Sequence, residues 1–265
     1  MANLYFPQLT AGAMAQYPIR KVRLDRTIKN ILPDGSMILS SDPSGARLVW
    51  QLSYTDLAIS DVEAIQAHFN ACIGPFHAFT FIDPTDNMLL ASSDLTNTVW
   101  QASSLIQVVL GASDPTGGSG AFVVTNTGQA NEEISQTLSV PGNYQYCFSL
   151  YANSAQPSTL ALVRRGSSSE GSDNIPVGPG WTRIASGGRL EDTGDVFTVA
   201  ISLLAGQQVE LYGMQLEAQI APSRYRPTGA ANGIHSNAHW TTNQLTVTAD
   251  GLNLFSTAFS IEAST

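Results

Sequence analysis

The sequence predicts a mainly β protein with a single α-helix, divided into two domains. Apolar and polar residues alternate in many short segments, which is the period-two pattern of strands with one buried face. Clusters of Gly, Pro, Ser and Asn separate these segments, as expected for turns between strands. One stretch, residues 60–73, instead carries apolar residues at the three- and four-residue spacing of a helix.

The composition limits the classes of function. A chain of 265 residues is long enough for two ordinary domains, each with its own core. Charged residues make up 12%, about half the usual fraction, which suits either a surface covered by partner proteins or a β surface rich in Ser, Thr, Asn and Gln. The net charge of -9 argues against binding to a nucleic-acid backbone. We also expect no membrane span, because no apolar run approaches the roughly 18 residues required. We expect no secretion signal, because the N-terminus lacks a basic region followed by an apolar one.

The N-terminal part predicts an irregular arm followed by a β-hairpin. We expect residues 1–16 either to pack on a neighbouring subunit or to be disordered. Val22, Leu24 and Ile28 then predict a strand, Pro33-Asp34-Gly35 predicts a turn, and residues 37–39 predict the returning strand. The first strand carries five cations, which form either a solvated face or a subunit contact: Arg20, Lys21, Arg23, Arg26 and Lys29.

A strand, a helix and a second strand follow without a break. Residues 46–55 alternate as a strand with one buried face. Ser60 and Glu63 have the spacing of a capping box, which predicts the start of a helix. Gly74-Pro75 ends this helix, and residues 76–82 predict a strand rich in aromatics. The helix is expected to place one apolar stripe on a sheet, formed by Val62, Ile65, Phe69, Cys72 and Ile73.

The run LVWQLSYTDLAISDVEAIQAHFNACIGPFHAFTFIDPTDN, residues 48–87, resembles the belt domain of distal tail proteins from bacteriophages and gene transfer agents. The resemblance covers residues 1 to about 91 and the C-terminus. It implies a sandwich-like sheet carrying one helix, with several copies closed into a ring, a hexamer in this family, at the tip of the tail. The implied partners are the tail tube protein and tail-tip or hub proteins. The implied location is the virion tail, after synthesis in the host cytoplasm.

Residues 92–227 predict a second domain, a jelly-roll β-sandwich. Eight short β patterns separated by turn clusters lie between residues 105 and 216. Two of them, residues 144–150 and 196–203, place large apolar residues at one parity and should form the core. The runs NMLLASSDLTNTVW and VELYGMQLEAQIAPSRYRPTG resemble the first and last parts of carbohydrate-binding-module-like jelly rolls in phage structural proteins.

The C-terminal segment, residues 228–265, predicts only a hairpin around Asp250-Gly251. Two strands cannot bury a core of their own. We therefore expect them to complete the first sheet, so that residues 1–91 and 228–265 form one β-sandwich domain and the jelly roll is an insertion.

The charges of this first domain are separated along the sequence. Outside residues 92–227, the basic residues are the five cations above and Arg47, and after position 50 only acids remain. A head-to-tail ring contact would use such a pattern. The acids expected to face the cationic strand of the next copy are Asp56, Asp61, Glu63, Asp83 and Asp86.

Sugar-binding sites need aromatic faces for stacking, and amides or carboxylates for hydroxyl groups. The candidates for contact with a host-surface glycan, each of them equally suited to a core position, are Trp100, Tyr151, Trp181 and Tyr212. Similar modules hold a structural calcium ion near the first and last strands, which would involve Asp94 and Glu217. We otherwise expect no cofactor, and we read His235-x-x-x-His239 as a polar connector or strand more readily than a zinc site.

We expect no enzymatic activity, because no nucleophile lies beside a base and no phosphate loop is present. The carboxylates Glu191, Asp192, Asp195, Glu210 and Glu217 would suit glycoside hydrolysis only as a correctly spaced pair. Cys72 and Cys147 occupy positions expected to be buried, which favours free thiols over a disulfide. The sequence thus favours a structural tail-ring protein carrying an outward jelly roll. The alternative is a soluble carbohydrate-binding or adhesion protein without a ring.

Overall fold

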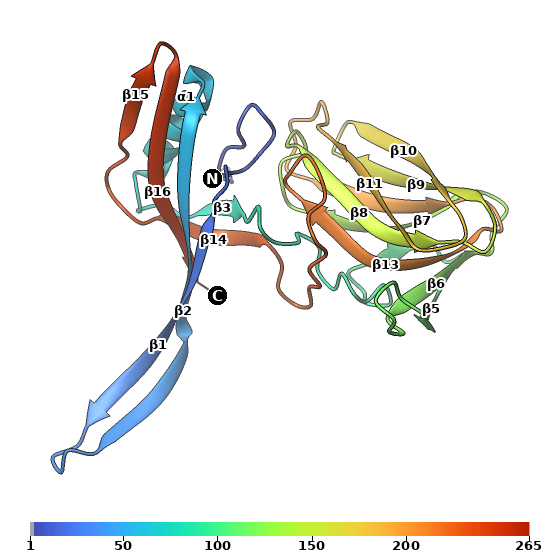
Figure 1. The fold of residues 1–265 in the computed structure, drawn as a ribbon, viewed down its shortest axis with the longest axis horizontal. Coiled ribbons are helices and arrows are strands. Elements are labelled where there is room, and N and C mark those ends of the chain that lie inside the picture. The colour runs from blue at the N-terminus through green and yellow to red at the C-terminus, as the bar shows by residue number, and fades with distance from the viewer. Residues whose placement is uncertain (1–2, 265) are drawn as a thin grey trace. The chain divides into compact units, whose positions relative to one another are not determined.

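The computed structural model describes residues 3–264 and divides the chain into two compact units (Figure 1). Unit 1 comprises Met1–Ile82 and Ile234–Thr265, and unit 2 comprises Asp83–Gly233. The predicted fold class is confirmed, because the described residues form antiparallel sheets and one helix, α1. No helix in this part of the chain is both long and apolar enough to cross a membrane.

Unit 1 is built on one six-stranded sheet in the order β1-β2-β16-β14-β3, with β15 paired to β16. Because β16 lies between β2 and β14, the C-terminal segment completes the first sheet as predicted. The strands are β1 (Arg20–Ile31), β2 (Met37–Leu57), β3 (Phe79–Ile82), β14 (Ile234–Trp240), β15 (Val247–Gly251) and β16 (Leu254–Ser264).

Helix α1 (Ile59–Cys72) packs its buried residues Val62, Ile65 and Cys72 against this sheet. The predicted capping box is wrong: the N-cap is Ala58, which supplies no side-chain hydrogen bond. Ser60 lies inside the helix, and the observed N-cap lies two residues before the predicted one.

The predicted apolar stripe of α1 is one residue too long. Ile73 is the C-cap in a left-handed conformation, with φ 53, and its side chain is 63% exposed. Phe76 is also exposed, and β3 begins three residues after it, at Phe79.

The N-terminal arm packs on its own unit, contrary to both expectations. Phe6, Leu9 and Met14 are buried, and the backbone N–H of Phe6 donates to the carbonyl of Thr80 on β3 at 2.9 Å. The Tyr54 hydroxyl donates to the carbonyl of Met14 at 3.0 Å. Buried apolar side chains thus hold the arm on unit 1. The sequence did not predict this packing, because these residues are spaced too irregularly to indicate a strand or a helix.

Unit 2 is a jelly-roll sandwich of two five-stranded antiparallel sheets, ordered β10-β9-β12-β7-β4 and β11-β8-β13-β6-β5 (Figure 1). The eight predicted strands are present, and β4 and β10 are additional. The strands are β4 (Gln101–Ala102), β5 (Ile106–Ala112), β6 (Ala121–Asn126), β7 (Glu132–Leu138), β8 (Tyr146–Asn153), β9 (Ser158–Arg165), β10 (Glu170–Val177), β11 (Thr182–Gly188), β12 (Phe197–Leu203) and β13 (Gln208–Glu217).

Unit 2 begins at Asp83 and ends at Gly233, outside the predicted boundaries of 92 and 227. The side chain of Asn87 explains the earlier start. Its oxygen accepts from the backbone N–H groups of Leu89 at 3.1 Å and Leu216 at 3.0 Å, and its amide donates to the carbonyl of Met214 at 2.9 Å. These bonds join residues 83–91 to the last strand of the sandwich.

Candidate binding site

Strand alternation gives the sheet β11-β8-β13-β6-β5 one core face and one outer face. On β8, Phe148 and Leu150 point into the core and are fully buried, whereas Tyr151 is half-buried on the outer face. On β13, Leu211 is buried in the core and Tyr212 is half-buried on the outer face. The outer face therefore carries aromatic side chains that are not part of the core.

Register places three of these outer side chains in one row across the sheet. Tyr151 is the direct partner of Tyr212 on β13 and of Arg183 on β11. The rings of Tyr151 and Tyr212 have centroids 6.1 Å apart, and the Arg183 guanidinium carbon lies 5.5 Å from the Tyr151 centroid. Tyr225, from the segment after β13, meets Tyr212 edge-on at 5.5 Å. We call Tyr151, Tyr212, Tyr225 and Arg183 the tyrosine row.

The members of the row are held in different ways. Arg183 donates to the Ser149 hydroxyl at 3.0 Å and to the carbonyl of Ser223. The Tyr225 hydroxyl lies 3.3 Å from that of Ser92, and burial raises the pKa of Tyr225. Within the described chain, the hydroxyls of Tyr151 and Tyr212 have no hydrogen-bond partner. Two phenol groups are thus available to a ligand.

A bulge in β13 lets the rings approach one another. Register shifts between Tyr212 and Gln215, and Gly213 adopts φ 67. A Cβ at this glycine would lie 3.2 Å from the Tyr225 ring and 3.3 Å from the Tyr151 ring. Glycine supplies both the left-handed backbone and the space.

The next pair along the same two strands is polar. Asn153 on β8 faces Glu210 on β13, and the Asn153 amide donates to Glu210 Oε2 at 2.6 Å. The Asn153 oxygen accepts from the backbone N–H of Gly180 at 2.8 Å. In the described chain, Glu210 Oε1 has no partner. A fixed amide and an open carboxylate oxygen therefore lie beside the aromatic row.

A cavity of about 400 Å³ begins at this polar pair. We call it the polar pocket. It is lined by Asn153, Ser154, Ala155, Gln156, Pro157, Ser158, Gln207, Gln208, Val209 and Glu210.

Of the four predicted glycan contacts, the structure brings Tyr151 and Tyr212 together. Trp100 does not belong to the site: it is 5% exposed and its indole N–H donates to the carbonyl of Ala91 at 3.1 Å. Trp181 is half-buried just before β11, two residues from Arg183 and outside the tyrosine row. Arg183 and Asn153 were not predicted as site residues. Both have the outward parity of their strands, but parity alone does not give the register that places them beside Tyr151 and Glu210.

The two calcium candidates are each engaged by their own neighbours. Asp94 accepts from the backbone and hydroxyl of Thr96 at 3.0 and 2.6 Å. Glu217 is fully buried and accepts from the Gln215 amide at 2.7 Å and the Ser223 N–H at 2.9 Å. Among the described residues, no three His, Cys, Asp or Glu side chains gather as a metal site.

Two further carboxylates hold loops together. Asp192 is buried and accepts from the Ser167 hydroxyl, the Ser168 N–H and the Gly194 N–H, each at 2.7 Å, and these bonds lower its pKa. Asp114 accepts from the Thr116 hydroxyl at 2.6 Å and from backbone N–H groups, which lowers its pKa to about 2. Both carboxylates support turns and lie outside the tyrosine row.

The predicted acidic surface is not assembled on unit 1. Asp61 is buried and accepts from the Thr10 N–H at 2.8 Å. Asp83 is buried at the start of unit 2, where Asp86 also lies. This correction leaves Asp56 and Glu63 exposed on unit 1.

The predicted cationic strand is exposed, and three of its cations are partly engaged within the unit. Arg23 pairs with Asp25 at 3.0 Å, and Arg26 pairs with Asp42 across the hairpin. The Lys21 ammonium lies 5.6 Å from the Trp50 ring centroid. Arg20 and Lys29 are exposed, and the described chain supplies neither with an acidic partner.

The β1–β2 hairpin extends past the rest of its sheet (Figure 1). In the described chain, β16 pairs with β2 only from Arg47 to Leu57, so residues 26–42 pair only with each other. We call residues 26–42 the hairpin tip. Its register puts exposed apolar side chains on both faces. They are Ile28 and Ile38 on one face, Ile31, Met37 and Leu39 on the other, and Leu32 in the turn.

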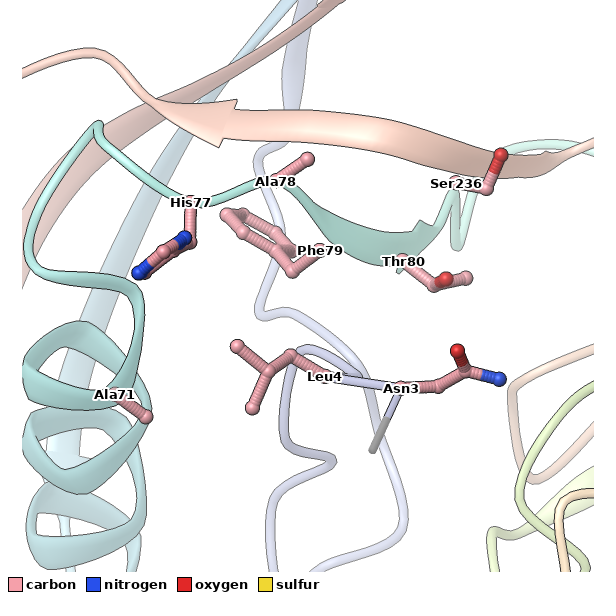
Figure 2. Close-up of a pocket in the computed structure, with 8 residues that line it drawn as sticks. All are labelled: Asn3, Leu4, Ala71, His77, Ala78, Phe79, Thr80 and Ser236. Carbon is pink, nitrogen blue, oxygen red and sulfur yellow. The ribbon is translucent and has the colours of Figure 1, made fainter. Parts of the chain in front are cut away.

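Unit 1 also has a pocket of about 570 Å³ (Figure 2). Leu4 from the N-terminal arm and Phe79 from β3 point toward it, beside Ala71 on α1. Its described lining contains one imidazole, His77, and no carboxylate. The lining therefore offers no acid–base pair and no metal ligand set.

No protein-family model and no curated protein sequence matches the chain. Solved structures with partial similarity include the enzymatically active domain of tailspike protein 4 from bacteriophage CBA120, at TM-score 0.40 and 17% identity over 52% of this chain and 22% of that one. A CBM22-1 xylan-binding domain from Paenibacillus barcinonensis Xyn10C aligns at TM-score 0.41 and 17% identity, over 52% of this chain and 96% of its own. The CBM22-1–CBM22-2 tandem of that protein aligns at TM-score 0.43 and 18% identity, over 66% and 61%.

Proposed function

We propose that unit 2 is a glycan-binding module and that its site is the tyrosine row. The observation that carries this proposal is the juxtaposition of Tyr151 and Tyr212 with Asn153 and Glu210 on two paired strands. Tyrosine rings offer apolar faces to the C–H surfaces of sugars. The free phenol groups, the amide and the open carboxylate oxygen suit hydroxyl groups.

We propose binding without cleavage. Hydrolysis of a glycosidic bond generally requires two carboxyl groups facing the scissile bond. Among the described residues of the tyrosine row and the polar pair, Glu210 supplies the single carboxylate, and Asn153 holds one of its oxygens. The Asn153 amide donates a hydrogen bond to Glu210 but cannot act as the second carboxylic acid.

The test is retention of the protein by an array of bacterial-surface oligosaccharides and polysaccharides. Tyr151→Ala and Tyr212→Ala should each weaken retention about tenfold, because stacking on one aromatic ring contributes on the order of 1 kcal/mol or more. Tyr151→Phe is the matched control and should retain most of the affinity, since the ring remains. Absence of retention by the wild type, or equal retention by the Tyr151→Ala/Tyr212→Ala protein, would overturn the proposal.

We also propose that unit 1 assembles the chain into a closed ring of a phage-like tail, a hexamer by resemblance to distal tail proteins. The observation that favours this function is the hairpin tip, whose apolar side chains are exposed on both faces. A two-stranded ribbon is marginal in water by itself, and exposed apolar patches mark interaction sites. The tail tube and tail-tip or hub proteins would then be its neighbours in the virion tail.

A second copy of this chain is the occupant that we propose for the hairpin tip. Lys29 in the hairpin tip and Arg20 at the start of β1 give the hairpin available positive charge. Asp56 and Glu63 give another part of unit 1 exposed negative charge. Such a distribution fits a head-to-tail contact between copies. A soluble adhesin, the alternative function, needs no such contact.

Assembly is tested by native mass spectrometry of the purified protein and of isolated particles. Ile31→Asp/Leu39→Asp should give folded monomers, because it places two charges in the contact. Thr242→Asp/Thr248→Asp adds the same two charges at exposed polar positions of unit 1 outside the hairpin tip and is the matched control. Normal rings from the Ile31→Asp/Leu39→Asp protein would exclude the tip as the contact. A wild type that is always monomeric and absent from particles would favour the adhesin.

A further inference from the structure

The polar pocket continues the tyrosine row toward one end of the sandwich. The outer-face pairs follow one another along β8 and β13, first Tyr151 with Tyr212 and then Asn153 with Glu210. Asn153 and Glu210 also line the pocket. The inference below rests on the proposed glycan binding and concerns which part of a glycan enters the pocket.

The lining of the polar pocket is rich in amides and hydroxyls. Asn153 and Gln207 use both ends of their amides within the chain. Three side-chain groups have no hydrogen-bond partner in the described structure: Glu210 Oε1, the side-chain oxygen of Gln208 and the side-chain amide of Gln156. These open groups offer acceptors and donors to a ligand that carries several hydroxyl groups.

Part of the pocket lining is chain that is held in place. Residues 154–157 connect β8 to β9, and the Ser154 N–H donates to the carbonyl of Gly178 at 3.1 Å. The Gln207 amide donates to the Ser158 hydroxyl at 2.8 Å and the Thr159 carbonyl at 3.0 Å. A ligand that extends from the tyrosine row into the pocket therefore contacts chain that is held in place, and a cavity of about 400 Å³ is within the range of small-molecule sites.

We propose that the polar pocket receives the terminal residue of a glycan whose preceding residues stack on Tyr212 and Tyr151, and that this terminal residue is uncharged. Among the described lining residues, Glu210 alone is charged. A terminal uronic or sialic acid would bring its carboxylate near this carboxylate without a cation to offset the repulsion. A neutral sugar would instead donate a hydroxyl to Glu210 Oε1.

Two variants at neighbouring turns test the role of the pocket. Ala155 lines the pocket and is exposed, so Ala155→Trp should fill it without disturbing the core. Ala205 is exposed in the adjacent β12–β13 turn and does not line the pocket, so Ala205→Trp is the matched control. On an array of short oligosaccharides attached by one end, Ala155→Trp should weaken retention at least about tenfold, and Ala205→Trp should not.

The charge of the terminal residue is tested with oligosaccharides printed in pairs, neutral-terminated and uronic-acid-terminated. The wild type should favour the neutral form by about tenfold, and Glu210→Gln should narrow this preference to about threefold or less. Thermal melting shows that each variant is folded. Equal retention by Ala155→Trp and wild type, with loss in Tyr151→Ala, would overturn the terminal pocket and keep the glycan-binding face. A wild type that retains neutral-terminated and uronic-acid-terminated forms equally would overturn the proposal that the terminal residue is uncharged. A wild type that retains no oligosaccharide would overturn both proposals.

Discussion

The hairpin tip and the β8–β13 pair are both antiparallel strand pairs, but they differ in how their two faces are buried. The β8–β13 pair buries Leu150 and Leu211 completely on one face and carries half-buried tyrosines on the other. The hairpin tip buries neither face, and Ile31 and Leu39 are 68% and 60% exposed. One pair completes its packing within its own unit, and the other does not.

This difference is the physical basis for proposing one surface as a ligand site and the other as a protein contact. Full burial of a large apolar side chain contributes roughly 1.5–3 kcal/mol. The β8–β13 pair gains this within its fold, so its outer face can keep a few aromatic and polar groups for small contacts. The exposed apolar side chains of the hairpin tip do not gain it within unit 1, and in the proposed ring they would gain it by contact with another copy.

Removal of β15 and β16 should have the largest effect and would show whether the two units are stabilised separately. A chain ending at Asn243 lacks β16, which lies between β2 and β14 and contains the fully buried Ile261. The loss of several buried side chains approaches the 5–15 kcal/mol stability of a whole domain. Calorimetry should show loss of the unit 1 transition while the unit 2 transition remains. A truncated protein that melts like the full chain would show that β16 is dispensable.

The same Leu→Ala substitution in each of the two strand pairs tests the contrast between them directly. Leu211→Ala should destabilise unit 2 by about 2–5 kcal/mol, because it leaves a cavity in the core. Leu39→Ala should change the free energy of unfolding of the monomer by less than about 0.5 kcal/mol, because the Leu39 side chain lies in solvent. Chemical denaturation of dilute protein measures both. A large cost for Leu39→Ala would mean that the hairpin tip is covered within its own unit.

The next effect in size belongs to His68, a buried histidine of unit 1. The imidazole packs against Phe79, Phe6 and Trp240 with centroids 4.6–5.8 Å apart, and a ring nitrogen lies 3.7 Å from Cys72 Sγ. Burial lowers its pKa to about 4, from 6.5. As pH falls from about 6.5 to 4, the unfolded chain takes up a proton that the folded chain does not.

The stability of unit 1 should therefore fall by about 3 kcal/mol over this window, as expected for a pKa lowered by about 2.5 units. His68→Leu should remove this part of the acid sensitivity, measured by thermal melting at pH 7 and pH 4.5. His77→Leu, at a half-exposed histidine of the same unit, is the matched control. An unchanged pH dependence in the His68→Leu protein would contradict the buried neutral imidazole.

Strand alternation was the part of the fold that could be predicted from the sequence. Clear parity assigned Phe148 and Leu150 to the core. The C-terminal hairpin was assigned to the first sheet because two strands cannot bury a core of their own. β10 was not predicted, because its sequence, EGSDNIPV, has low strand propensity. Eight pairs with β9 hold this segment as a strand in the folded protein. Trp100 looked like a ligand contact because its turn-rich surroundings give no parity to place it.

Charges were predicted least well, since tertiary contacts decide which of them stay at the surface. Asp61 and Asp83 were expected in an interface, yet each accepts hydrogen bonds from a loop within its own unit. Asn153 and Glu210 became a pair only through the register of β8 and β13. Sequence position alone does not fix that register, because a bulge at Gly213 shifts the pairing.

A smaller cost in stability than that of Leu211→Ala is expected at Gly213, where it also tests the geometry of the tyrosine row. Gly213 and Gly206 both adopt left-handed backbone, with φ 67 and 68, so alanine at either position should cost about 1–2 kcal/mol of unit 2 stability. A Cβ at Gly206 meets no atom within 4 Å, whereas a Cβ at Gly213 would crowd the rings of Tyr225 and Tyr151. Gly213→Ala should therefore weaken glycan retention severalfold with every aromatic side chain still present, while Gly206→Ala should leave retention unchanged. Melting and array retention of the two proteins separate backbone strain from ring displacement. Equal retention by both would mean that the site tolerates displaced rings and that their spacing does not determine binding.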